Sequence, residues 1–146
     1  MLAKSFRDLN VYRLARESAK KVYDRSKNFP PEERYSLTDQ VRRSSRAVKA
    51  MIAEAWARRR YKAVFINKLD EALGEANETQ SWLDDALDCA YLVPADHDEL
   101  DRSYRAISGM LARMVGRAND FCKNIPATDY RSTISRVQED EPFFVD

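Results

Sequence analysis

The chain has 146 residues, enough for one domain with a single hydrophobic core. Its 25 lysines and arginines against 24 acidic residues give a net charge of +1, which excludes a polycation and an acidic solubilising chain. Only three glycines and five prolines are present, too few for the turns of a β-sandwich or barrel. The composition therefore favours a soluble helical protein whose charge must be analysed segment by segment.

No apolar run approaches the roughly 18 residues that a membrane helix needs, and residues 1–10 lack the apolar stretch of a signal peptide. We therefore expect a cytoplasmic protein without membrane contact. Cys89 and Cys122 fall near opposite ends of the last two predicted helices, too far apart for a disulfide within one chain. Both are expected to be free, buried thiols.

Apolar residues recur every three or four positions in four segments, the pattern of amphipathic helices. The predicted helices cover residues 9–27, 36–60, 63–92 and 96–123. Ser36 with Asp39, and Asp96 with Glu99, resemble capping boxes at two of the helix starts. Because short connections require antiparallel neighbours, the sequence predicts an all-α, up-down-up-down four-helix bundle.

The bundle should occupy residues 1–124, and residues 125–146, which show no sustained period, should form a flexible C-terminal tail. Gly74 lies inside the third predicted helix, where glycine costs about 1 kcal/mol relative to alanine. A close approach of a neighbouring helix at Gly74 would account for that residue.

Charge is distributed unevenly along the chain. Residues 34–62 contain nine basic and two acidic residues, whereas residues 63–93 contain one basic and seven acidic residues. A basic second helix therefore precedes an acidic third helix. On a helical wheel, one stripe of the second helix holds Arg42, Arg46, Lys49 and Arg60.

The basic stripe has two interpretations. Arginine forks match phosphate oxygens, so the stripe favours contact with a nucleic-acid backbone. Alternatively, the acidic third helix neutralises the stripe, within one chain or between subunits. Trp56 falls on the apolar face, so aromatic stacking of bases is not expected from the stripe. The candidate nucleic-acid-binding residues are Arg42, Arg43, Arg46, Lys49, Arg58, Arg59, Arg60 and Lys62.

A second side of the same helix consists of small residues, which permit close packing against another subunit. The residues that we assign to an oligomer interface are Ala47, Ala50, Met51, Glu54 and Trp56. Trp56 shares a face with Val48 and Ile52, so it is expected in the core or at that interface.

The sequence offers little material for catalysis or metal binding. The acidic residues Glu71, Glu75 and Glu78 share a face, but a di-metal bundle also needs Glu-x-x-His pairs on facing helices. The only histidine, His97, is expected to be exposed near the start of the fourth helix. No glycine-rich phosphate loop or Ser/His/Asp set is present. We therefore expect no metal, no cofactor and no enzymatic activity.

Several segments match a known pattern: FRDLNVY at residues 6–12, YSLTDQVRRSS at residues 35–45 and IAE at residues 52–54. Over roughly residues 6–122 the chain resembles the 23S ribosomal RNA intervening-sequence protein family of bacterial four-helix bundles. The resemblance implies a small homo-oligomer, a pentamer in the known cases, without enzymatic activity. It also implies kinship with accessory proteins that act beside reverse transcriptases in diversity-generating retroelements.

The chain departs from this pattern where asparagine and glycine are usual, with Met51 before the IAE segment and Ala55 after it, while Glu54 matches. The alanine favours an uninterrupted second helix. The sequence predicts a non-catalytic, oligomeric accessory protein that binds RNA or DNA through phosphate contacts. The alternative is a scaffold for a protein partner without nucleic-acid binding.

Overall fold

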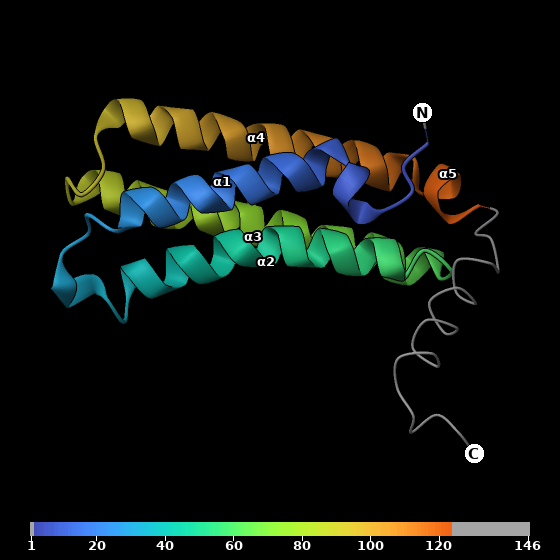
Figure 1. Cartoon of the computed structure of the whole chain (residues 1–146), viewed down its shortest axis with the longest axis horizontal. Helices are drawn as coiled ribbons and strands as arrows, with labels where there is room; N and C mark the ends of the chain where they lie inside the picture. Colours follow the sequence, from blue (N-terminus) through green and yellow to red (C-terminus); the bar gives the residue numbers. More distant parts are fainter. Residues whose placement is uncertain (1, 124–146) are drawn as a thin grey trace, which may run out of the picture.

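Four long helices dominate residues 2–123, the part of the chain that the computed structural model describes (Figure 1). They are α1 (Asn10–Ser26), α2 (Leu37–Ala57), α3 (Lys62–Asp88) and α4 (Pro94–Gly116). Two 3₁₀ helices, η1 (Phe6–Asp8) and η2 (Pro31–Glu33), and the short helix α5 (Ala118–Cys122) complete the described elements. The predicted tail, residues 125–146, lies outside them.

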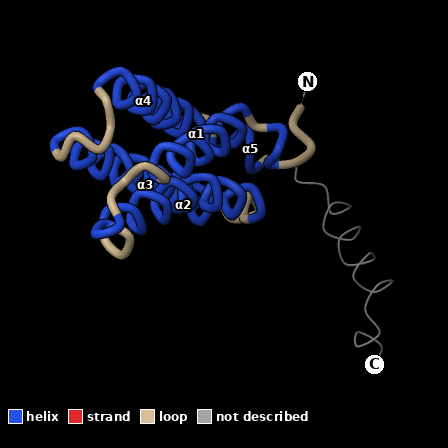
Figure 2. The backbone as a smooth tube through the Cα atoms, turned by 60° about the vertical axis from the view of Figure 1, so that its left-hand side comes forward, coloured by secondary structure: helices blue, strands red, loops and turns tan. Residues whose placement is uncertain are grey.

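Successive long helices run in opposite directions, and each packs on the next, with α4 closing against α1 (Figure 1). Residues 2–123 contain no strand (Figure 2). The prediction of an all-α, antiparallel four-helix bundle is thus confirmed. No helix within residues 2–123 is long and apolar enough to cross a membrane.

The core consists of one apolar stripe from each long helix, as the periodicity predicts. Its largest fully buried side chains are Tyr104, Phe65, Ile52, Leu69, Leu83, Leu100, Ile107 and Leu111. The α2 stripe also contains Val41, Val48 and Ala55, each without exposed surface. Burial of this apolar surface is the main force that holds the four helices together.

A buried polar contact joins α2 to α3. The Thr79 hydroxyl donates to Ser44 Oγ at 2.8 Å, and neither residue has exposed surface. Each hydroxyl also has a backbone acceptor in its own helix, Glu75 O for Thr79 (2.9 Å) and Val41 O for Ser44 (3.4 Å). The two hydroxyls meet only when they lie opposite each other, so this contact favours one register of α2 against α3.

The helix ends differ from the prediction in several places. Helix α3 ends at Asp88 rather than at residue 92, because Ala90 adopts a left-handed conformation with φ of 60°. The Tyr91 N–H then donates to the Ala86 carbonyl (2.9 Å) and the Ala90 N–H to the Leu87 carbonyl (3.0 Å). These bonds satisfy the last carbonyls of α3 in the manner of a Schellman motif, in which glycine usually occupies the left-handed position.

Both predicted capping boxes are wrong. Ser36 precedes α2, but its hydroxyl donates to Glu33 Oε1 (3.3 Å) rather than accepting from the helix. Helix α4 begins at Pro94, two residues before Asp96, because proline has its φ preset for the first helical position and no N–H to satisfy. At its other end α4 stops after Gly116, and α5 follows as a separate turn.

Three expectations about single residues are also wrong. Gly74 is exposed, and a Cβ added there would meet no atom within 4 Å, so no helix approaches it closely; nothing in the structure explains the glycine. Cys89 and Cys122 are free, but Cys89 is exposed in the turn after α3 and Cys122 is only half-buried in α5.

We predict that Ala90→Gly stabilises the protein by about 1 kcal/mol, because glycine adopts the left-handed conformation without the Cβ clash. Chemical denaturation measures the change. Ala112→Gly, at an exposed position inside α4, is the matched control and should lower stability by about 1 kcal/mol. Equal losses in both variants would contradict the interpretation of the turn at Ala90.

Candidate nucleic-acid interface

The cations of α2 point to two different sides of the helix. Arg43 reaches toward α3, whereas Arg42 and Arg46 reach toward α1. This division follows from helix geometry, because residues one position apart differ by about 100° in direction whereas residues four apart share a face.

On the α3 side, Arg43 is held by two carboxylates. Its guanidinium lies 3.4 Å from Glu75 Oε1 and 2.5 Å from Glu78 Oε1, and the Trp82 indole N–H also donates to Glu78 (3.2 Å). The hydrogen bond from Arg43 lowers the pKa of Glu78, whereas burial raises the pKa of Glu75. Arg43 is therefore engaged in joining α2 to the acidic helix.

On the α1 side, cations surround the half-buried ring of Tyr23. The four cationic side chains lie 4.7 to 5.6 Å from the ring centroid, and we call them, with the ring, the Tyr23 cluster: Lys20, Lys27, Arg42 and Arg46. Arg42 Nε also donates to Ser26 Oγ at 2.7 Å, which fixes the guanidinium in place.

Acidic partners are scarce in the Tyr23 cluster. Asp24 lies 2.7 Å from Lys20 Nζ and 3.9 Å from Lys27 Nζ. Arg42, Arg46 and Lys49 form no ion pair with any residue in the described range 2–123. Neutralisation by the acidic helix of the same chain therefore applies to Arg43 and not to these three residues, which we call the basic face.

The remaining predicted cations lie in the turn between α2 and α3, residues 58–61, and at Lys62, the first residue of α3, at the end of the bundle where α5 lies (Figure 1). The Arg59 guanidinium sits 3.6 Å from the centroid of the Trp56 ring, and its Nε donates to the Trp56 carbonyl (2.8 Å). Trp56 is half-buried against the core rather than fully enclosed. Tyr61 is 60% exposed, with Arg60 5.9 Å from its ring. Aromatic rings therefore accompany the cations of this turn, which the sequence interpretation of the stripe did not consider.

The predicted interface residues form an open surface of the single chain. Ala47 and Met51 are half-exposed, and Ala50 and Glu54 are exposed. The Glu54 carboxylate lies 3.2 Å from Lys68 Nζ on α3.

His97 departs from its expected exposure. Its side chain is 13% exposed, and Nε2 lies 2.9 Å from Asp84 Oδ1 on α3. The packing of α4 against α3 therefore covers His97, which the position of the residue near the helix start did not predict. Within residues 2–123, no three His, Cys, Asp or Glu side chains gather in a way that would hold a metal ion.

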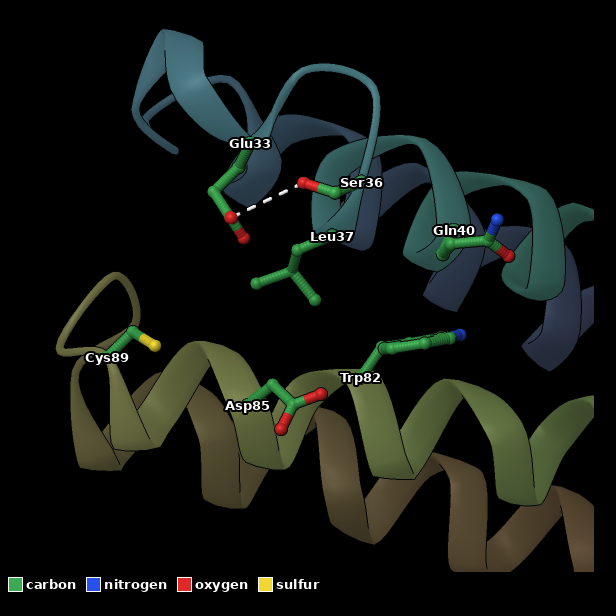
Figure 3. A pocket seen from close by; sticks show the side chains of 7 residues that line it. All are labelled: Glu33, Ser36, Leu37, Gln40, Trp82, Asp85 and Cys89. Carbon is green, nitrogen blue, oxygen red and sulfur yellow. Dashed lines mark hydrogen bonds between the residues drawn. The ribbon is translucent and has the colours of Figure 1, made fainter.

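A groove that sequence reasoning missed lies at the opposite end of the bundle, between the start of α2 and the last turns of α3 (Figure 3). Its lining residues are Glu33, Ser36, Leu37, Gln40, Trp82, Asp85 and Cys89. Glu33 and Asp85 give it acidic character. No sequence signal reveals this groove, because its two walls come from segments about 45 residues apart.

Comparison with known proteins shows which family the chain belongs to. The sequence profile described as "23S rRNA-intervening sequence protein" matches residues 7–113, most of the bundle. The chain belongs to this family. The structure of this family member is similar to a crystal structure, at 1.70 Å resolution, of a protein of unknown function from the S23 ribosomal protein family of Bacteroides thetaiotaomicron. The TM-score is 0.67 at 28% sequence identity, over 73% of this chain and 95% of the other. No curated protein matches the sequence.

In this member of the 23S rRNA-intervening sequence family, residues of the YSLTDQVRRSS segment face three directions around α2. Val41 and Ser44 face the core, Arg43 faces α3, and Arg42 faces α1. Ala55, one of the departures from the family pattern, is fully buried, and α2 continues through it without a break.

The Arg43 pairing predicts a defined pH dependence. Because Arg43 lowers the pKa of Glu78 below its ordinary 4.5, ionised Glu78 stabilises the fold above that range, and the stabilisation is lost as the pH falls through the lowered pKa. Glu78→Gln should therefore lower the free energy of unfolding at pH 7 by about 0.5–1 kcal/mol. The difference from wild type, measured by urea denaturation, should shrink as the pH falls below about 4.5 toward the lowered pKa of Glu78.

Glu75→Gln is the matched control for this experiment. Burial raises the pKa of Glu75, so its carboxylate opposes folding at neutral pH and its replacement should cost less than that of Glu78. A Glu78→Gln deficit that persists undiminished at pH 3 would contradict the assigned pairing.

Proposed function

We propose that the protein is a non-catalytic accessory protein that binds a nucleic-acid backbone through its basic face. The observation that carries the proposal is the alignment of Arg42, Arg46 and Lys49 along one side of α2 without carboxylate partners in the described chain. The family description refers to an intervening sequence of 23S rRNA, which is consistent with an RNA partner.

The chemistry of the basic face suits phosphate binding. Arg42 is held against Ser26 and the Tyr23 ring, so its guanidinium loses little freedom when it binds a phosphate. From Arg42 to Lys49 the helix rises about 10 Å, a length that matches about three nucleotides of one duplex strand. Contacts of this kind position a nucleic acid without reading its sequence.

Self-association forms the second part of the proposal. The small side of α2, around Ala47 and Ala50, is uncovered in the single chain and permits close packing of a second copy. The resemblance implies a pentamer, and a ring would repeat the basic face and convert weak contacts into avidity.

A protein-interaction scaffold is the second candidate function. The groove lined by Trp82, Glu33 and Asp85 supports it, because an aromatic ring beside two carboxylates suits a cationic segment of a partner. The two candidates differ in a simple measurement, since a scaffold of this kind would bind no nucleic acid even at low salt.

Replacement of Arg42, Arg46 and Lys49 together by glutamine should weaken binding to any nucleic acid. Each lost phosphate contact should reduce the slope of log affinity against log salt by about 0.7–0.9. The expected loss of slope is therefore about two to three units, measured by fluorescence anisotropy at several salt concentrations. The bundle should keep its thermal stability within about 1 kcal/mol, because these side chains are not part of the core.

Arg43→Gln is the matched control, since Arg43 is adjacent in sequence but paired with Glu75 and Glu78. It should leave the salt slope unchanged. Equal effects of Arg43→Gln and the triple substitution would contradict the assignment of the basic face. Light scattering of all three proteins should show the same oligomer, and a monomeric wild type at micromolar concentration would contradict the self-association.

A further inference from the structure

The turn between α2 and α3 combines four cations with an exposed aromatic ring. Residues 58, 59, 60 and 62 are basic, and Tyr61 stands among them with 60% of its surface exposed. No acidic residue occurs between Glu54 and Asp70, so the chain through this turn is locally cationic. Binding of phosphates alone would not require an exposed aromatic ring among these cations.

The backbone of the turn is well anchored. The Arg58 N–H donates to the Glu54 and Ala55 carbonyls (3.0 and 3.1 Å), and the Tyr61 N–H donates to the Arg58 carbonyl (3.0 Å). The Tyr61 carbonyl in turn accepts from the Phe65 N–H at 2.9 Å, in the first turn of α3. The backbone that carries the Tyr61 ring is thus fixed, so little backbone entropy is lost when the exposed ring binds a ligand.

Neighbouring side chains extend this platform. Arg59 is held against the Trp56 ring by its contact with the ring and by its hydrogen bond to the Trp56 carbonyl. The Arg60 guanidinium lies 5.9 Å from the centroid of the Tyr61 ring. Arg58 and Lys62, which flank these residues in the sequence, are both exposed.

Tyr35 provides a comparison within the same chain. It is 83% exposed and has Arg34 5.3 Å from its ring, but it follows Glu32 and Glu33 at the other end of the bundle. Among the exposed rings of residues 2–123, Tyr61 is therefore the one whose neighbours in the sequence are cations and include no carboxylate.

We propose that Tyr61 stacks against an unpaired base of a single-stranded nucleic acid, while Arg58 and Lys62 bind the flanking phosphates. Every base offers a π-face, so such stacking tolerates any sequence but requires the base to be free of a duplex stack. The inference rests on the proposed function and adds a preference for single strands over duplexes.

The test compares a labelled 12-nucleotide oligothymidylate with a DNA duplex of equal length in titrations of the full chain at low salt. Tyr61→Ala should weaken binding of the single strand about 5- to 100-fold, the loss of one stacked base, and change duplex binding less than about twofold. Tyr61→Phe should retain single-strand affinity because the ring remains. Tyr35→Ala, the matched control, should change neither.

A second measurement locates the strand. Trp56 and Trp82 are the two tryptophans of the chain, so in Trp82→Phe the emission comes from Trp56, beneath Arg59. Saturating oligothymidylate should quench this emission, and the quenching should fall in Trp82→Phe/Tyr61→Ala at the same oligonucleotide concentration.

The outcomes separate this inference from the proposed function. Wild-type binding to the duplex with none to the single strand, or an equal loss for both ligands in Tyr61→Ala, would overturn stacking and leave backbone binding intact. Unchanged single-strand affinity in Tyr61→Ala would also overturn stacking. Absence of all binding at low salt would overturn both proposals.

Discussion

The packing of α2 against α3 determines where every cation of α2 can point. Val41, Val48 and Ile52 must face the core, and the fully buried hydrogen bond between Thr79 and Ser44 favours one register of the two helices. Once that face is fixed, the other directions around α2 follow from the helical repeat. Arg43 then reaches the carboxylates of α3, and Arg42 reaches Tyr23 on α1.

This constraint divides the cations of α2 into two groups, one paired with α3 and one facing away from it, which the overall composition does not show. The net charge of +1 results from a basic segment and an acidic segment, yet only one arginine of α2 pairs with the acidic helix in the described chain. The exposed ion pair of Arg43 contributes modestly to stability. The cations of the basic face form no ion pair in the described chain, so they can bind an anionic ligand. At the C-terminal end of α2, the turn to α3 adds the exposed ring of Tyr61 and the half-buried ring of Trp56.

Sequence periodicity was sufficient to predict the four helices and the core, because burial of apolar surface dominates both. It also placed Arg42, Arg46 and Lys49 in one stripe. It did not tell which neighbouring helix the stripe faces, since that depends on the arrangement of the helices around the bundle. The left-handed Ala90, the contact of His97 with Asp84, and the groove beside Trp82 likewise depend on tertiary packing between distant segments.

The proposed function requires that Arg42 and Arg46 contact a nucleic acid while Arg43 stays paired with α3. Modification of the full chain by an arginine-selective dicarbonyl reagent, read residue by residue by tandem mass spectrometry, tests it directly. With a saturating oligonucleotide at low salt, Arg42 and Arg46 should be modified several-fold more slowly than without it, and Arg43 should react at the same rate in both samples. Protection of Arg43 alone, or no protection of Arg42 and Arg46 while the oligonucleotide is bound, would contradict the account.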